Sequence, residues 1–82
     1  MAVIDTTKFL EVIHDAYGLR VANLELSTLF RKLNEWDSMV AVFIAAAAYD
    51  HYDVQVSSED LLTCNTLEDL KKLIESRLPS QP

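Results

Sequence analysis

Apolar residues recur at helical spacing near the beginning of the chain. The stripe consists of Phe9, Val12, Ile13 and Ala16. Residues three or four positions apart share one face of a helix, so the spacing predicts a helix from about Thr6 to Tyr17. Gly18 follows, and glycine favours a helix end because it adopts a left-handed backbone without strain. We therefore expect the first helix to end at Gly18.

A long connection and a second helix come next. The connection, Leu19 to Trp36, carries apolar side chains that we expect to pin it across the bundle. These are Leu24, Leu26, Leu29, Phe30 and Leu33. The second helix is predicted to begin at Asp37 or Ser38, since both residue types cap helices, and to end near Tyr52. Asp53 then suits the turn, because aspartate tolerates a left-handed backbone better than most non-glycine residues.

Two more helices are predicted in the last third of the chain. Ser57 or Ser58 is suited to cap a short helix around Glu59 to Leu62. Thr66 and Asp69 form a variant capping box, with aspartate where glutamate or glutamine is usual. The apolar stripe that follows this box consists of Leu67, Leu70, Leu73 and Ile74.

Composition agrees with a helical fold. Half of the 82 residues are hydrophobic, which is too apolar for a disordered chain, and one Gly and two Pro are too few turn formers for a many-stranded β fold. Pro79 lies beyond the last stripe and is expected to close its helix. We predict an all-α fold in a single domain, residues 1–82: a four-helix bundle with three main helices, one short helix and a long first loop.

Charge and cysteine content exclude several functions. Thirteen acidic and seven basic residues give a net charge of −6, which disfavours binding to nucleic-acid phosphates and favours basic partner surfaces. No basic segment precedes a long apolar run, so we predict no secretory signal and a cytoplasmic location. Cys64 is the only cysteine, which excludes an intramolecular disulfide, and no Cys/His cluster has metal-ligand spacing. We expect Cys64 to be a small packed side chain.

The segment Glu35–Met39 (Glu-Trp-Asp-Ser-Met) stands directly at the predicted start of the second helix. No charged residue occurs from Ser38 through Tyr49, a stretch too short for the roughly 20 residues of a membrane span. The segment resembles the attachment site of acyl carrier proteins, in which Asp-Ser-Leu or Asp-Ser-Met opens the second helix and the serine carries a 4′-phosphopantetheine arm. The downstream segments follow the order of that family: an apolar helix, the exit Tyr52–Val56, the turn Ser58–Leu62 and the helix start Thr66–Leu70.

The resemblance covers nearly the whole chain and implies a discrete, specialised carrier. It implies that Ser38 receives the arm from coenzyme A through a phosphopantetheinyl transferase, and that Asp37 helps this enzyme to position its metal and substrate. The carrier itself would bind no metal and catalyse nothing. The site also suits a phosphate chemically, because free N–H groups and the positive end of the helix dipole favour an anion. Taken alone, Asp37-Ser38 is an ordinary helix cap.

The second helix differs from that of fatty-acid-synthesis carriers, which typically line it with acidic residues. Here Asp50 is the nearest acid, and periodicity does not identify the buried face because the helix is apolar all round. The resemblance places Ile44, Ala45, Ala48 and Tyr52 inward. The expected partner surface, more hydrophobic than acidic, consists of Met39, Val40, Phe43 and Ala47, beside Trp36 as a packing residue or a partner contact. A rotated bundle or pairing with another copy are the alternatives.

Three function classes follow. The first is a carrier in a specialised lipid or secondary-metabolite pathway, served by an acyl or aminoacyl ligase, an acyltransferase or a synthase; an aminoacyl carrier of the D-alanyl type is its closest competitor. The second is an unmodified helical adaptor. The third, a hydrolase using Ser38, lacks a local base, because the only histidines are His14 and His51, which we expect to be surface or boundary residues rather than ligands. Cargo length stays open, and a monomer is expected.

Overall fold

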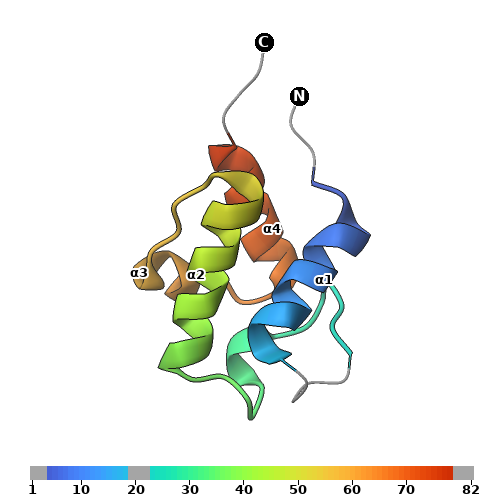
Figure 1. Cartoon of the computed structure of the whole chain (residues 1–82). Helices are drawn as coiled ribbons and strands as arrows, with labels where there is room; N and C mark the ends of the chain where they lie inside the picture. The colour runs from blue at the N-terminus through green and yellow to red at the C-terminus, as the bar shows by residue number, and fades with distance from the viewer. Residues whose placement is uncertain (1–3, 19–22, 79–82) are drawn as a thin grey trace.

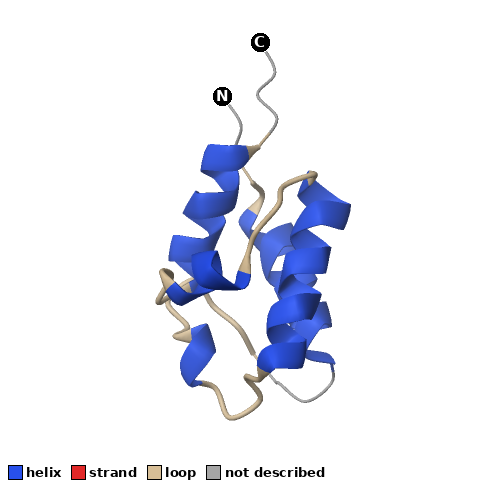
Figure 2. Ribbon diagram, turned by 90° about the vertical axis from the view of Figure 1, so that its left-hand side faces the viewer, coloured by secondary structure: helices blue, strands red, loops and turns tan. Residues whose placement is uncertain are grey.

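The computed structural model describes residues 4–18 and 23–78, and within these ranges it contains helices and loops but no strand (Figures 1 and 2). The helices are α1 (Thr6–Tyr17), the 3₁₀ helix η2 (Phe30–Lys32), α2 (Ser38–Tyr52), α3 (Ser58–Leu62) and α4 (Leu67–Arg77). This arrangement confirms the predicted all-α fold with three main helices, one short helix and a long first connection. The expected role of Pro79 lies outside the described residues.

Helix ends lie where local side-chain chemistry places them. Asp53, after α2, has φ 57° and ψ 38°, the left-handed conformation predicted for it, and Gly18 also has a positive φ of 73°. Thr66 and Asp69 form a reciprocal capping box at the start of α4. Ser57 caps α3, so the prediction of Ser57 or Ser58 resolves to the first of the two.

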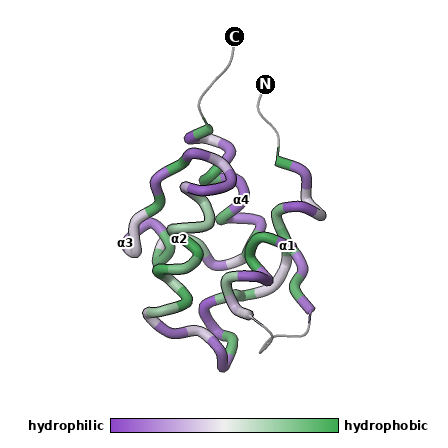
Figure 3. Tube along the Cα trace, viewed as in Figure 1, coloured by the Kyte–Doolittle hydropathy of each residue, from purple (hydrophilic) through white to green (hydrophobic). Residues whose placement is uncertain are grey.

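The core joins all four α-helices and the connection. Its buried side chains include Phe9, Ile13 and Tyr17 of α1, Phe30 of η2, Val40, Ile44 and Ala48 of α2, Leu61 of α3, and Leu67, Leu70 and Ile74 of α4. In Figure 1, α2 runs alongside the other helices with its long axis close to vertical. In Figure 3 the trace of this helix is mostly green, the colour of apolar residues, and turns purple only in its last turn.

The long connection is fixed to the helices by packing and hydrogen bonds. Phe30 is buried, and its carbonyl oxygen accepts a bond of 2.6 Å from the Tyr17 hydroxyl. Burial, with the carboxylates of Glu35 and Asp37, raises the pKa of Tyr17 to about 12. Leu24, Leu26 and Leu33 pack partly against the core, as predicted. Leu29 does not, because the turn into η2 directs it outward, where it is largely exposed. The expectation that Leu29 helps to pin the connection was therefore wrong.

Further bonds join the connection to the beginning of α4. The backbone N–H groups of Leu67 and Glu68 donate to the carbonyl oxygens of Thr28 and Leu26, at 3.1 and 2.9 Å. Arg31 Nε donates to the Cys64 carbonyl at 2.9 Å. These contacts set the path of the chain that leads to the start of α2. Among the described residues, no helix is long and apolar enough to cross a membrane.

Candidate functional site

Asp37 and Ser38 have different positions at the start of α2. Asp37 is the N-cap residue, and its Oδ1 accepts a hydrogen bond of 2.9 Å from the Val40 N–H. Ser38 is the first residue of the helix and is exposed. No hydrogen bond engages its hydroxyl within the part of the chain that the structure describes. The capping role is therefore taken by Asp37, which leaves the serine hydroxyl accessible for chemistry.

The backbone around Ser38 suits a phosphate group. The helical ladder begins with the Ala41 N–H, which donates to the Asp37 carbonyl at 3.1 Å. The N–H groups of Ser38 and Met39 have no hydrogen-bond partner among the described residues. Such N–H groups at a helix start favour an anion, as does the positive end of the helix dipole. An exposed hydroxyl beside them fits a phosphodiester linkage at Ser38.

Trp36 anchors the approach to this helix start. Its ring meets that of Phe30 edge to face, with centroids 5.6 Å apart and an angle of 75° between the planes. Its backbone N–H donates to the Leu33 carbonyl at 3.0 Å. Trp36 is half-buried against the core, which agrees with the packing interpretation, and its role as a partner contact stays a prediction. The aromatic pair fixes the loop that leads to Asp37 and the start of α2.

His14 lies in α1, and His51 lies in α2 at the opposite end from Ser38. His51 is exposed in the last turn of α2, thirteen residues after Ser38, which is about 20 Å along a helix. His14 is half-buried in α1, where it lines a separate hollow with Glu11 and Leu24. Within the described ranges, no group of three acidic, histidine or cysteine side chains is placed to hold a metal ion.

The exposed face of α2 differs from the predicted one. Val40 is 0% exposed, so its assignment to the partner surface was wrong, and Ala47 is half-buried rather than facing solvent. Met39 and Phe43 are exposed as predicted. Ile44 and Ala48 are buried as expected, whereas Ala45 and Tyr52 are only half-buried.

The exposed face of α2 differs from the predicted one because of the way the helix is seated between its neighbours. Val40 enters the core together with Ile44, four residues later, and both are fully buried. Val42 and Tyr49, which the sequence prediction omitted, are 60% and 56% exposed. The sequence did contain a clue to the exposure of these two residues. They follow Ser38 by four and eleven positions, and such intervals return to the same face of a helix. We call Met39, Val42, Phe43 and Tyr49 the α2 ridge.

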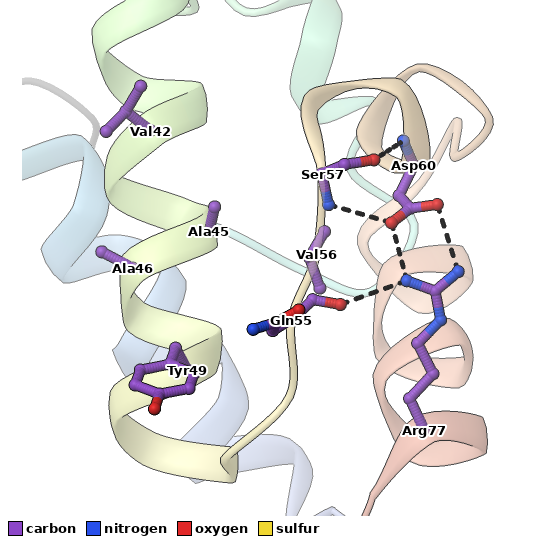
Figure 4. A pocket seen from close by; sticks show the side chains of 9 residues that line it. All are labelled: Val42, Ala45, Ala46, Tyr49, Gln55, Val56, Ser57, Asp60 and Arg77. Carbon is purple, nitrogen blue, oxygen red and sulfur yellow. Dashed lines mark hydrogen bonds and ion pairs between the residues drawn. The ribbon is translucent and has the colours of Figure 1, made fainter.

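An open groove of about 720 Å³ lies between α2 and the segment that leads into α3 (Figure 4). Val42, Ala45, Ala46 and Tyr49 of α2 line one side, and Gln55, Val56 and Ser57 line the other, with Asp60 and Arg77 behind them. Ala45 points across the groove toward the 55–57 segment in this view. We call this hollow the α2 groove. Its volume falls in the range of small-molecule sites.

One ion pair holds the outer wall of the α2 groove. Arg77 Nη1 and Nη2 donate to Asp60 Oδ2 and Oδ1, at 2.6 and 3.1 Å, and Nη1 also donates to the Gln55 carbonyl at 3.2 Å. The bonds from Arg77, together with the Ser57 N–H, hold the pKa of Asp60 far below its usual range. The pair therefore joins α3 and α4 with both charges satisfied.

Cys64 is a packing residue. It is buried, and its Sγ donates to the Asp60 carbonyl at 3.5 Å. Burial raises the pKa of its thiol, which keeps it protonated and unreactive near neutral pH. This agrees with the role predicted from the sequence.

Comparison with known proteins identifies one family. The family described as "phosphopantetheine attachment site" matches residues 7–74. Neither a curated protein nor a solved structure matches the chain. The matched range begins in α1 and ends in α4, so the likeness extends over the whole bundle as well as the serine at the start of α2.

Proposed function

Since the chain belongs to the phosphopantetheine attachment-site family, whose members bind 4′-phosphopantetheine covalently, we propose that Ser38 is the residue that receives this arm. The observation that carries the proposal is the exposed Ser38 hydroxyl beside a helix cap that Asp37 already provides. The neighbouring free N–H groups support a phosphodiester there. When bound, the arm supplies a thiol that holds an acyl group as a thioester.

The proposed function is that of a carrier which brings a tethered acyl group to successive enzymes. Ser38 anchors the arm, Asp37 fixes the helix start and presents a carboxylate to the transferase, and the bundle keeps both in a constant orientation. Tethering raises the effective concentration of the cargo at each enzyme to which the carrier binds. In this proposal the chain itself performs no chemical step.

The partners in this proposal are a phosphopantetheinyl transferase and the ligase, acyltransferase or synthase of a specialised lipid or secondary-metabolite pathway in the cytoplasm. The α2 ridge lies on the helix that begins with Ser38, and each of its four apolar side chains is about half exposed or more. Contiguous apolar side chains on a small protein mark interaction surfaces. We therefore propose that partners meet an apolar ridge rather than a row of acidic side chains.

The attachment is tested by measuring the intact mass after incubation with coenzyme A and a broad-specificity phosphopantetheinyl transferase. The native chain should gain the mass of one phosphopantetheine, and Ser38→Ala should gain none. Ser58→Ala is the matched control, because Ser58 is also exposed at the first position of a helix, and this variant should be modified like the native chain. A folded native chain that gains no mass would support an unmodified helical adaptor instead.

A further inference from the structure

Two buried aromatic residues connect α1 to the start of α2. Tyr17 is the last residue of α1, and its hydroxyl donates the 2.6 Å hydrogen bond to the Phe30 carbonyl in η2. The Phe30 ring in turn meets the Trp36 ring edge to face, with centroids 5.6 Å apart. Trp36 directly precedes Asp37 and Ser38 in the chain. A continuous series of contacts therefore leads from α1 to the residue that caps α2.

The first two members of this series are closed to partner proteins. Tyr17 and Phe30 are 1% and 0% exposed, so their side chains affect an enzyme only through the residues that they hold in place. Burial, together with the carboxylates of Glu35 and Asp37, raises the pKa of Tyr17 to about 12. The hydroxyl therefore stays protonated near neutral pH and remains a hydrogen-bond donor. The influence of both carboxylates also shows that Tyr17 lies close to the segment that leads into α2.

Hydrogen bonds from neighbouring elements hold η2 in place. Arg31 Nε donates to the Cys64 carbonyl at 2.9 Å, and its Nη2 donates to Asn65 Oδ1 at 3.3 Å. Tyr17 joins η2 to α1. A 3₁₀ helix of three residues has poor internal hydrogen-bond geometry, so it depends on such outside contacts. Loss of the Tyr17 hydroxyl therefore frees η2 from α1 while the bonds of Arg31 remain.

We propose that the Tyr17 hydroxyl positions the site of arm attachment: acting through Phe30 and Trp36, it holds the start of α2 in the conformation that the phosphopantetheinyl transferase binds. The inference rests on the proposed function and gives a role in it to a residue outside the Glu35–Met39 segment. Without the hydroxyl, the loop before α2 samples further conformations. An enzyme that binds one of them then shows a weaker apparent affinity, in proportion to the fraction that is competent.

Tyr17→Phe tests this role, because it removes the hydroxyl and keeps the ring. Rates of mass gain with coenzyme A and a broad-specificity transferase, at several concentrations of the chain, give KM for the chain and kcat. Losing a buried hydrogen bond shifts a local equilibrium by roughly tenfold, so KM should rise at least about threefold, with kcat within about twofold of native. Tyr52→Phe is the matched control and should keep both native values. The Tyr52 hydroxyl is also buried, but it has no hydrogen-bond partner among the described residues and lies at the far end of α2.

A second control separates positioning from a general loss of stability. Ile74→Val trims a buried side chain of α4 and should destabilise the fold to a similar extent as the lost hydrogen bond, yet its KM should be native. Phe30→Leu removes the aromatic contact with Trp36 and should raise KM as Tyr17→Phe does, which keeps the test open if Tyr17→Phe does not fold.

The outcomes distinguish this inference from the proposed function. Native KM values for folded Tyr17→Phe and Phe30→Leu would overturn the positioning role. An equal rise of KM in Ile74→Val would overturn it as well, since lost stability would then explain the effect. A folded native chain that gains no arm in the same measurement would instead refute the proposed function, on which the positioning role depends.

Discussion

At the residue scale, Asp37 combines a structural role with a proposed recognition role. Replacing it with alanine removes the acceptor of the Val40 N–H and should lower the free energy of unfolding by about 1 kcal/mol. Asp37→Asn keeps a capping oxygen, so its stability should stay within a few tenths of a kcal/mol of the native value. Urea unfolding followed by circular dichroism measures both changes.

The same two variants test recognition by the transferase. Asp37→Asn removes the negative charge that the transferase is proposed to use, so this variant should be modified at least about tenfold more slowly than the native chain while remaining as stable. The rate is obtained from the mass gain over time. If Asp37→Asn is modified at the native rate, the carboxylate charge has no recognition role and Asp37 acts only as a cap.

The Asp60–Arg77 pair makes the stability of the fold depend on pH in the acidic range. The pKa of Asp60 is lowered in the folded chain by the bonds from Arg77 and Ser57, so its stabilising contribution is complete above the ordinary value of 3.8. The contribution is lost as the pH falls below that value toward the lowered pKa. The urea midpoint should therefore drop between about pH 5 and about pH 2.

Asp60→Asn is the control for this acid effect. The variant should be less stable than the native chain at about pH 7, yet it should lose less stability on acidification. The remaining acid sensitivity belongs to Asp69 and Glu75, whose pKa values are lowered by other hydrogen bonds. Identical acid profiles for the native chain and the variant would show that the ion pair contributes nothing to folding.

At the scale of elements, the helix ends could be predicted from the sequence because capping is local chemistry. Asp53 and the Thr66–Asp69 box occupy the positions that short-range rules assign to them. The buried face of α2 could not be predicted in this way. Its residues are apolar all round, so the rotation of the helix depends on what α1, α3 and the 54–56 segment present to it, and one sequence pattern does not contain that information.

The α2 groove was inaccessible to sequence reasoning for a related reason. Its two walls come from α2 and from the segment around Val56, and its charged pair joins α3 to α4 across seventeen positions. Ser38 could be predicted because its neighbours in the sequence identify it. Val42 and Tyr49, by contrast, line the α2 groove only because of the elements that lie opposite them, and their neighbours in the sequence do not reveal those elements.

Two substitutions on adjacent residues of α2 test its rotation. Ile44→Ala deletes a fully buried side chain and should cost about 2–5 kcal/mol of unfolding free energy. Phe43→Ala removes a larger side chain that is 47% exposed, and should cost less than about 1 kcal/mol. Urea unfolding measures both. A larger cost at Phe43 than at Ile44 would mean that the helix is rotated in solution.

At the scale of the whole molecule, net charge and the α2 ridge lead to opposite expectations for how partner binding depends on salt concentration. A chain with a net charge of −6 that docked through its acidic groups would lose affinity steeply as salt screens them. The ridge contains no charged residue, and apolar burial is not screened by salt. We expect the affinity for a phosphopantetheinyl transferase to fall less than about threefold between about 50 and 500 mM salt.

Surface substitutions decide between these two contributions. Phe43→Ser on the α2 ridge should weaken transferase binding at least about tenfold, because truncating an apolar anchor at the centre of an interface has this order of effect. Leu62→Ser is the matched control, since Leu62 is 61% exposed, lies on α3 and is not part of the ridge. Affinities from calorimetry should be native for this control. A steep salt dependence with native affinity for Phe43→Ser would instead assign docking to the acidic surface, and the apolar ridge would then need another occupant.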